Sequence, residues 1–327
     1  MNDRIPPSPP MIQPIQAENR PLWSVMIPTY NCIGFLKDTL ECVLTQDPGE
    51  EWMQIEVIDD HSTDGDVEAL VQEVGRGRVR FFRQPANVGS LRNFETCLNR
   101  SQGHWVHILH GDDQVKSGFY KEIKYLLDTY PQAGAAFTKN SYMNHRGYET
   151  GIERQIQDEP GLIGNWLTRI AGRQLIQPPS IVVKREVYEK LGSFFAVHYG
   201  EDWEMWTRIA AHYPVAYSPK CLAIYRVHPN NISSSSIASG QYIKDLKTVI
   251  NIIQDYLPAE IRKPLKTHAL KTKSIYFARH AHGVYLKNPE AALHYAKGAL
   301  QLHINPMTLF FVSLLYAKNL FRWQQKK

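Results

Sequence analysis

The sequence predicts an α/β fold, with a mostly parallel sheet flanked by helices and a helical extension at the C-terminal end. Between residues 22 and 138, short apolar runs of strand length alternate with segments whose apolar residues recur at helical spacing. After residue 240 the helical spacing continues without strands between the segments. Strands separated by helices of this length pair in parallel and carry helices on both faces of the sheet.

The expected strands and helices follow one another regularly. Each expected strand is an apolar run that ends in polar residues, and each expected helix gathers its apolar residues on one face. Strands are predicted at 22–28, 54–60, 78–84, 104–110, 134–138, 180–183 and 220–228, and helices at 34–46, 66–74, 90–101, 118–130, 162–171, 185–191 and 200–212. The polar stretch 144–160 is expected to be a mobile loop. In the tail, Asn288 and Pro289 have the residue types of a helix cap and first turn.

The chain is expected to have three parts. Residues 1–20 are rich in proline and lack the apolar core of a secretory signal, so they predict a flexible arm. Residues 21–238 form the predicted α/β domain, and 239–327 a helical C-terminal region. The four cysteines lack C-x-x-C spacing, which indicates neither a zinc site nor a disulfide framework and favours a reducing cytoplasm.

The charge of the chain is unevenly distributed. Residues 241–327 carry 14 Lys/Arg and 4 Asp/Glu, whereas residues 1–240 carry 23 and 28. A basic tail favours an anionic partner, and an anionic membrane surface fits better than nucleic acid because no zinc-finger or stacking-aromatic pattern accompanies the charge. The segment 306–327 is too short to span a bilayer and could lie in a membrane interface. The alternative is a terminal helix that packs on the protein.

Polar residues follow three of the predicted parallel strands. They are Thr29-Tyr30-Asn31, Asp59-Asp60 and Asp112-Asp113. The carboxyl ends of parallel strands share one edge of a sheet, where ligands bind in such folds. Adjacent carboxylates repel each other, and a bound cation offsets this repulsion. We therefore expect a ligand site at this edge, with a simple Asp-rich turn as the alternative.

Six motifs then occur in order over residues 22–235. They are SVMIPTYN (24–31), EVIDDHSTD (56–64), NVGSLRNFETCL (87–98), HILHGDD (107–113), GEDWEMWTR (200–208) and YRVHPNNIS (225–233). The ordered set closely resembles the inverting family 2 glycosyltransferases, which have the GT-A fold. The resemblance implies a nucleotide-sugar half at about 21–140 and an acceptor half at about 141–238. It does not extend to the tail after 240.

The resemblance also implies roles for individual residues. Pro28, Thr29 and Tyr30 would line the nucleotide pocket; Asp60 would bind the base edge with support from Asp59; Arg92 and Asn93 would lie near the ribose or diphosphate. Asp112 and Asp113 end the motif known in the family as DXD and would hold Mn²⁺ or Mg²⁺, with His228 assisting. Asp202 would be the catalytic base, flanked by Glu201. One position departs from the family, since His110 stands where many members have aspartate.

The function that follows is a metal-dependent, inverting glycosyltransferase. Its donor would be a nucleotide sugar, with UDP favoured. Its acceptor would be a saccharide or a lipid-linked saccharide in surface polysaccharide or lipopolysaccharide assembly. The reaction would take place in the cytoplasm, at the inner face of the membrane. Two alternatives stay open: a sugar-phosphate nucleotidyltransferase, disfavoured by the single Gly and single Lys of PTYNCIGFLKD, and a non-catalytic scaffold that binds a nucleotide sugar or a partner. Trp203 and Trp206 are either core residues or a platform for a sugar ring.

Overall fold

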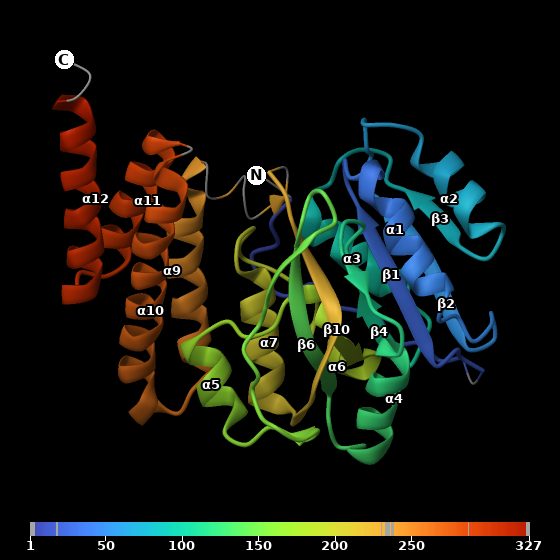
Figure 1. The fold of residues 1–327 in the computed structure, drawn as a ribbon. Coiled ribbons are helices and arrows are strands. Elements are labelled where there is room, and N and C mark those ends of the chain that lie inside the picture. The colour runs from blue at the N-terminus through green and yellow to red at the C-terminus, as the bar shows by residue number, and fades with distance from the viewer. Residues whose placement is uncertain are drawn as a thin grey trace. The chain divides into compact units, whose positions relative to one another are not determined.

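The computed structural model describes residues 4–17, 19–229, 231–232, 236, 239–286 and 288–324. The chain divides into two compact units, which are considered separately. The sheet unit comprises the chain up to Trp166 together with Leu175–Ala196 and Glu201–His228. The helical unit comprises Leu167–Gln174, Val197–Gly200 and the chain from Pro229 onward. Figure 1 labels the elements of both units.

The sheet unit is built on one mixed sheet of ten strands (Figure 1). Eight strands lie in the order β3-β2-β1-β4-β9-β6-β10-β5, while β7 pairs with β6 and β8 with β10. Their bounds are β1 Trp23–Thr29, β2 Met53–Asp59, β3 Arg80–Arg83, β4 Trp105–Ile108, β5 Gln114–Val115, β6 Ala135–Asn144, β7 Glu149–Ile152, β8 Gly161–Leu162, β9 Ile181–Lys184 and β10 Val215–Val227. The pairs β1–β2, β1–β4, β2–β3 and β6–β10 are parallel. The predicted α/β class with a mostly parallel sheet is confirmed.

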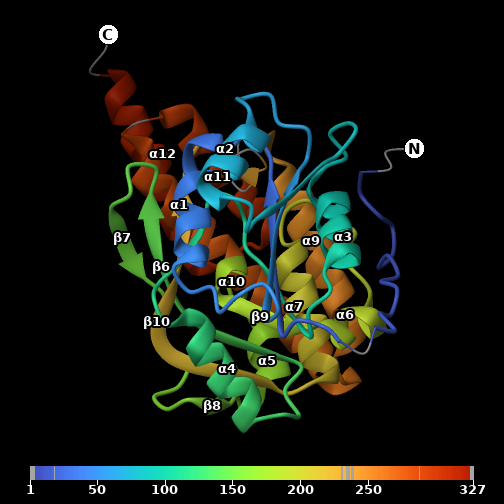
Figure 2. The ribbon, with the colours of Figure 1, turned by 90° about the vertical axis from the view of Figure 1, so that its right-hand side faces the viewer.

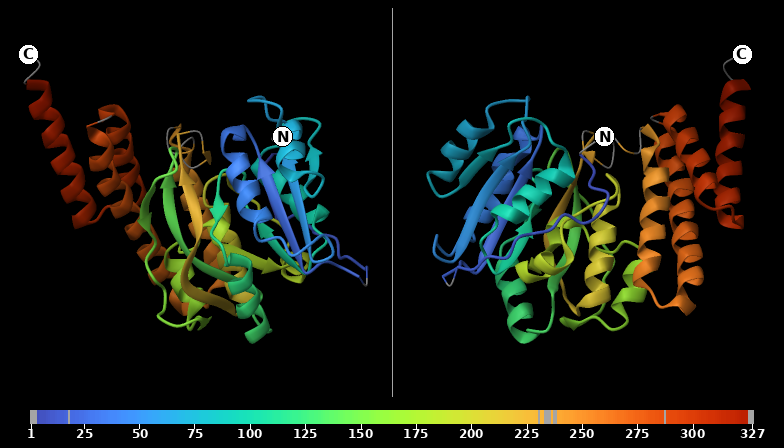
Figure 3. Two further views of the ribbon diagram at one scale, coloured as in Figure 1. Left: turned by 45° about the vertical axis from the view of Figure 1, so that its right-hand side comes forward. Right: turned by 180° about the vertical axis from the view of Figure 1, so that it is seen from behind.

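Helices cover both faces of this sheet. Their bounds are α1 Ile33–Leu44, α2 Val67–Gly75, α3 Ser90–Arg100, α4 Phe119–Thr129, α6 Arg185–Leu191 and α7 Glu201–His212. Helices α1, α2 and α4 lie on one face and α3, α6 and α7 on the other, as Figure 1 and the rear view in Figure 3 show. The main core cluster includes Leu36, Val71 and Ile123 of the first set of helices together with Ile55 of β2. Burial of these apolar side chains is the main stabilising contribution.

Two strands are longer than their sequence patterns indicate. β6 runs to Asn144 rather than residue 138, and β10 begins at Val215 rather than residue 220. Pro219 interrupts the apolar pattern of β10, and since proline has no N–H to donate, the pairing with β6 shifts register between Ser218 and Ala223. The stretch expected to be a loop contributes β7, which pairs with β6 as a hairpin.

The helical unit contains α9 Gln241–Ile253, the short 3₁₀ helix Gln254–Tyr256, α10 Ala259–Tyr285, α11 Pro289–Leu302 and α12 Pro306–Gln324, together with α5 (Trp166–Gly172) apart from Trp166. Tyr242 packs on Phe277 with ring centroids 4.4 Å apart. The predicted cap at Asn288 is confirmed, because its side chain accepts a hydrogen bond from the Ala291 N–H at 3.0 Å. Among the described residues, none of the helices is long and apolar enough to cross a membrane.

Candidate active site

The carboxyl ends of β2, β1 and β4 form one edge of the sheet, as expected from the parallel pairing. Backbone hydrogen bonds continue beyond the strands: the Asp60 N–H donates to the Thr29 carbonyl at 2.8 Å, and the Gly111 N–H donates to the Pro28 carbonyl at 3.1 Å. A side-chain carbon at Gly111 would lie only 2.8 Å from Thr29 Oγ1. The glycine of HGDD is therefore required for the two segments to approach.

His110, Asp112 and Asp113 form an acidic cluster at this edge. One ligand atom from each of the three lies within 4.8 Å of the others. Asp112 Oδ2 pairs with His228 Nε2 at 2.8 Å. Asp113 is 1% exposed, and its Oδ1 accepts a hydrogen bond from the Arg226 N–H at 2.9 Å. Arg226 lies in β10, which pairs antiparallel with β5 immediately after the cluster, and His228 is the residue that follows β10.

Burial and mutual repulsion control the protonation of the two carboxylates. Burial, together with the charge of Asp112, raises the pKa of Asp113 well above its usual value. Burial also tends to raise the pKa of Asp112, but the hydrogen bond from His228 and the charges of His110 and His228 outweigh it, so this pKa is lowered. Burial lowers the pKa of His110, which favours the neutral imidazole that a metal requires. In the absence of a cation, Asp113 therefore tends to hold a proton, which relieves its repulsion with Asp112. A bound cation would relieve the same repulsion.

The donor set of the acidic cluster fits a divalent cation. Carboxylate oxygens and an imidazole nitrogen are ligands that Mn²⁺ accepts, and Mg²⁺ prefers the oxygens. Asp113 Oδ2 is a buried oxygen without a hydrogen-bond partner in the described part of the chain, so it is available to a cation. Sequence reasoning assigned no ligand role to His110, because it compared that position with the aspartate of relatives. The sequence signal that could have indicated a ligand role for His110 is its position two residues before Asp112.

The second predicted carboxylate pair serves different purposes at its two positions. Asp59 is fully buried; its Oδ1 accepts from Ser62 Oγ at 2.5 Å and its Oδ2 from Arg83 at 2.7 Å. Asp60 Oδ1 accepts from the Val88 N–H at 2.7 Å, and Oδ2 accepts from the Gly89 N–H at 2.9 Å. Burial raises the pKa of Asp60, although these two N–H groups act in the opposite direction. Asp59 therefore fixes the strand end, and Asp60 fixes the loop before α3.

The remaining residues predicted for the nucleotide side differ in accessibility. Pro28 and Thr29 are buried at the end of β1, whereas Tyr30 is 51% exposed. Arg92 pairs with Glu95 at 2.7 Å within α3. Asn93 is buried and donates to the Ile58 carbonyl at 2.9 Å, so its amide supports β2. Ligand contacts by these residues stay predictions.

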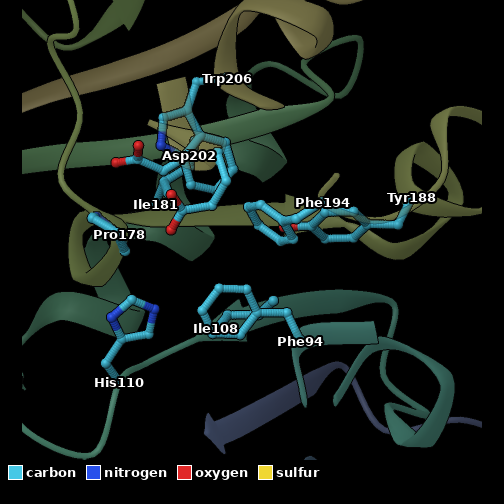
Figure 4. Close-up of a pocket in the computed structure, with 10 residues that line it drawn as sticks. Phe94, Ile108, His110, Pro178, Ile181, Tyr188, Phe194, Asp202 and Trp206 are labelled. Atoms are coloured by element: carbon cyan, nitrogen blue, oxygen red, sulfur yellow. The ribbon is translucent and has the colours of Figure 1, made fainter. Parts of the chain in front are cut away.

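A small cavity lies between the end of β4 and the start of α7. It is lined by His110 of the acidic cluster and by both carboxylates of α7, Glu201 and Asp202, with the rest of its wall formed by Phe94, Ile108, Pro178, Ile181, Tyr188, Phe194 and Trp206. Figure 4 shows His110 and Asp202 on opposite sides of this cavity. Its volume of about 10 Å³ is the space of one water-sized sphere, so a sugar ring can enter only after side chains move.

The N-terminal turn of α7 places its carboxylates at this cavity. Glu201 and Asp202 are each 8% exposed and occupy the first turn, where the helix dipole favours the ionised form. Asp202 Oδ1 accepts the N–H of the following residue at 2.7 Å. Of the two tryptophans, Trp203 is fully buried, whereas Trp206 borders the cavity and its indole N–H has no hydrogen-bond partner among the described residues.

This sheet, with an acidic cluster at the ends of its parallel strands, is that of a glycosyltransferase of the GT-A type. The family model described as Glycosyl transferase family 2 matches residues 24–192, more than half of the chain. The chain belongs to this family and is a glycosyltransferase.

Named relatives are glycosyltransferases, and solved structures share the fold. The chain is 27% identical over 219 residues to the putative teichuronic acid biosynthesis glycosyltransferase TuaG of Bacillus subtilis, covering 66% of this chain and 83% of that protein. TarS 1–349 of S. aureus, solved in complex with UDP-GlcNAc, shares the fold with a TM-score of 0.66 and 17% identity over 86% of this chain and 81% of that one. The mannosyltransferase PcManGT of Pyrobaculum calidifontis, solved with GDP-Man and Mn²⁺, has a TM-score of 0.53 and 16% identity, covering 95% and 91%.

Proposed function

We propose that the protein is a metal-dependent, inverting glycosyltransferase that uses a nucleoside diphosphate sugar, with UDP favoured. The observation that supports this most strongly is the shared cavity, in which His110 of the acidic cluster faces Asp202 of α7. A group that binds the donor's diphosphate and a group that accepts a proton must lie on either side of the reacting carbon. These two residues are 92 positions apart in sequence and meet through the tertiary fold.

The acidic cluster is proposed to hold the cation and the donor diphosphate. His110, Asp112 and Asp113 would be the ligands, with His228 orienting Asp112 through their 2.8 Å contact. When bound, a divalent cation of this kind supplies Lewis-acid stabilisation of the charge that develops on the leaving diphosphate. On the other side of β1, Asp60 and Tyr30 are proposed to contact the base, and Arg92 the ribose or diphosphate.

Asp202 is proposed to act as the general base. Its carboxylate would take the proton of the acceptor hydroxyl while that oxygen bonds to the anomeric carbon and the bond from this carbon to the diphosphate oxygen breaks, with the electron pair leaving on the diphosphate. Glu201, in the same helical turn, would hold the acceptor hydroxyl for this transfer. A single displacement from the face opposite the leaving group inverts the anomeric centre. General-base help of this kind contributes about 10²–10⁴-fold in rate.

The acceptor is proposed to be a saccharide or lipid-linked saccharide of a surface polymer, in the cytoplasm at the inner face of the membrane. The name of the relative TuaG, which refers to teichuronic acid biosynthesis, supports a surface polymer. Peripheral contact with the membrane is proposed for α12. Its side chains Phe310, Leu314 and Leu320 are 59%, 41% and 55% exposed, and residues 241–327 carry ten more basic than acidic residues (14 against 4).

Turnover of nucleotide sugars in the presence of Mn²⁺ tests the catalytic proposal. Purified protein is first screened by thermal shift against UDP-, GDP-, ADP-, CDP- and dTDP-sugars with and without the ion, because a ligand that binds the folded state raises the melting temperature. Release of nucleoside diphosphate is then measured for the wild type and Asp202→Asn. We expect the variant to bind the donor normally and to lose about 10²–10⁴-fold in kcat. Equal turnover by the two proteins would remove Asp202 as the base.

Vesicle binding tests the proposed contact of α12 with a membrane. The full chain and Phe310→Asp/Leu314→Asp are sedimented with vesicles that contain anionic lipid and with neutral ones. We expect only the wild type to pellet, and only with the anionic vesicles. Equal pelleting of both proteins would contradict the assignment to this helix face.

A further inference from the structure

The Pro-rich N-terminal arm, expected to be flexible, is bound to the sheet unit. The carbonyl of Pro6 accepts a hydrogen bond from the Ala196 N–H at 2.9 Å, and that of Pro10 accepts from the Ser193 N–H at 2.8 Å. Ile12 is fully buried, and the Gln13 carbonyl accepts from Arg185 at 2.9 Å. In Figure 2 the arm, in dark blue, runs beside α3 and α6. Prolines limit the freedom of the unbound segment, which lowers the entropy cost of binding it.

The segment that the arm binds is a wall of the cavity. Phe194, which lines the cavity beside Asp202, lies between the two N–H groups that donate to the arm. Gly192 has φ +78°, and a side-chain carbon there would lie 2.8 Å from the Pro10 carbonyl oxygen. Ala196 has φ +72°, a conformation that is costly for a residue with a side chain and needs support from its surroundings. The arm therefore helps to fix Phe194.

The beginning of the described arm lies at the other side of the site. A side-chain carbon at Gly89 would lie 3.0 Å from Arg4 Nε and 3.3 Å from Arg4 Cβ. Gly89 in turn donates its N–H to Asp60 Oδ2 at 2.9 Å. The positive charge of Arg4 lowers the pKa of Asp60, in opposition to the larger effect of burial. Arg4 is thus next to the loop that Asp60 holds at the carboxyl end of β2.

We propose that Arg4 binds the nucleoside diphosphate sugar. The N-terminal arm brings this residue to the nucleotide side of the active site, where its guanidinium donates hydrogen bonds to the nucleoside. The proposal rests on the proposed function, because it takes the ligand to be a nucleoside diphosphate sugar. A guanidinium offers five N–H donors and no acceptor, so it complements the carbonyl and hydroxyl oxygens of a nucleoside. Asp60 is 2% exposed and already accepts hydrogen bonds from Val88, Gly89 and Asn87, whereas Arg4 is exposed, so Arg4 is the more accessible polar group of the two.

Calorimetric titration of the full chain tests this assignment. The wild type is titrated, in Mn²⁺, with UDP, GDP, CDP, ADP and dTDP, and the tightest of these is used together with its monophosphate. Arg4→Gln is compared with Arg20→Gln, a matched loss of charge on the same N-terminal segment. Arg20 donates to the carbonyls of Gln102 and Gly103, both at 2.8 Å, and lies outside the site. Thermal melting of each protein without nucleotide reports any loss of stability.

We expect Arg4→Gln to raise the Kd of both the diphosphate and the monophosphate about tenfold, as the loss of one charge-assisted hydrogen bond does. Its melting temperature should stay that of the wild type, and Arg20→Gln should keep the wild-type Kd. Unchanged binding by Arg4→Gln, or an equal loss in Arg20→Gln, would overturn the role of Arg4 and leave the proposed function intact. A loss confined to the diphosphate would overturn the contact with the nucleoside. Failure of the wild type to bind any of the five would instead refute the proposed function and, with it, this proposal.

Discussion

Replacing Asp113 by asparagine is expected to stabilise the metal-free protein while removing its response to a cation. Asp113 is buried beside Asp112, and its Oδ2 lacks a hydrogen-bond partner among the described residues. An amide at this position keeps the acceptor for the Arg226 N–H and presents an N–H₂ group toward the carboxylate of Asp112. The variant exchanges a repulsive contact for an attractive one. It also loses a ligand that the wild type would offer to the cation.

The size of the effect follows from the geometry. Two unit charges at the 4.8 Å limit of the acidic cluster repel each other by about 3.5 kcal/mol at an effective dielectric constant of about 20. Protonation of Asp113, whose pKa is raised, already relieves part of this repulsion. We therefore expect a gain of about 2 kcal/mol in the free energy of unfolding, or about 4–8 °C in melting temperature for a unit of this size.

Thermal melting in EDTA and in Mn²⁺ measures both parts of this prediction. Asp128→Asn is the control, since its side chain is 53% exposed and pairs with Lys124 on the surface of α4. Because the pKa of Asp113 is raised in the folded state, the metal-free wild type should lose stability as the pH rises from 3.8 through the raised pKa. Asp113→Asn should lack this loss. A variant that melts lower than the wild type in EDTA, or that is stabilised by Mn²⁺ as much as the wild type, would refute the reasoning.

Three further predictions concern β4 and the residues that follow it. His110→Ala should weaken Mn²⁺ binding by about tenfold or more in a metal titration, and equal affinity would exclude His110 as a ligand. Gly111→Ala should lower the free energy of unfolding by about 1–3 kcal/mol, since the new carbon meets Thr29. The control Gly34→Ala in α1, where the added carbon has open space around it, should be neutral or stabilising. Equal denaturation midpoints for the two variants would contradict this prediction. Burial lowers the pKa of His107 to about 3, so the free energy of unfolding should fall as the pH drops from 6.5 toward 3. In denaturant titrations at several pH values, His107→Gln should reduce this dependence of the free energy of unfolding on pH. An unchanged dependence would show that His107 does not contribute.

The parallel part of the sheet could be predicted from the sequence because its strands are short, apolar and separated by helices. Parallel pairing alone then places the ends of 22–28, 54–60 and 104–110 on one edge, and this placement is confirmed by the registers of β1 with β2 and β4. Strand limits were less predictable where pairing overrides the local pattern. Pro219 and Lys220 break the apolar run of β10, yet the pairing with β6 continues on either side of them.

The contacts that complete the site were beyond the sequence pattern. His110 stands where the family resemblance led us to expect aspartate, and only its position against Asp112 and Asp113 indicates a ligand. The N-terminal arm has a composition typical of flexible segments, but it is held by hydrogen bonds from the backbone N–H groups of Ser193 and Ala196 and from the side chain of Arg185. Nothing in the arm's own residues indicates these partners. Backbone partners distant along the chain leave no periodicity for a sequence pattern to reveal.

The position of Arg226 in the last strand of the sheet unit, and of His228 directly after it, has a consequence for the newly synthesised chain. Arg226 lies 113 residues after Asp113, to which its N–H donates, and His228 lies 116 residues after Asp112. A polypeptide still attached to the ribosome and released only as far as β9 would therefore expose two neighbouring carboxylates without the groups that orient them. The proposed cation site is therefore complete only late in translation, after β10 has docked.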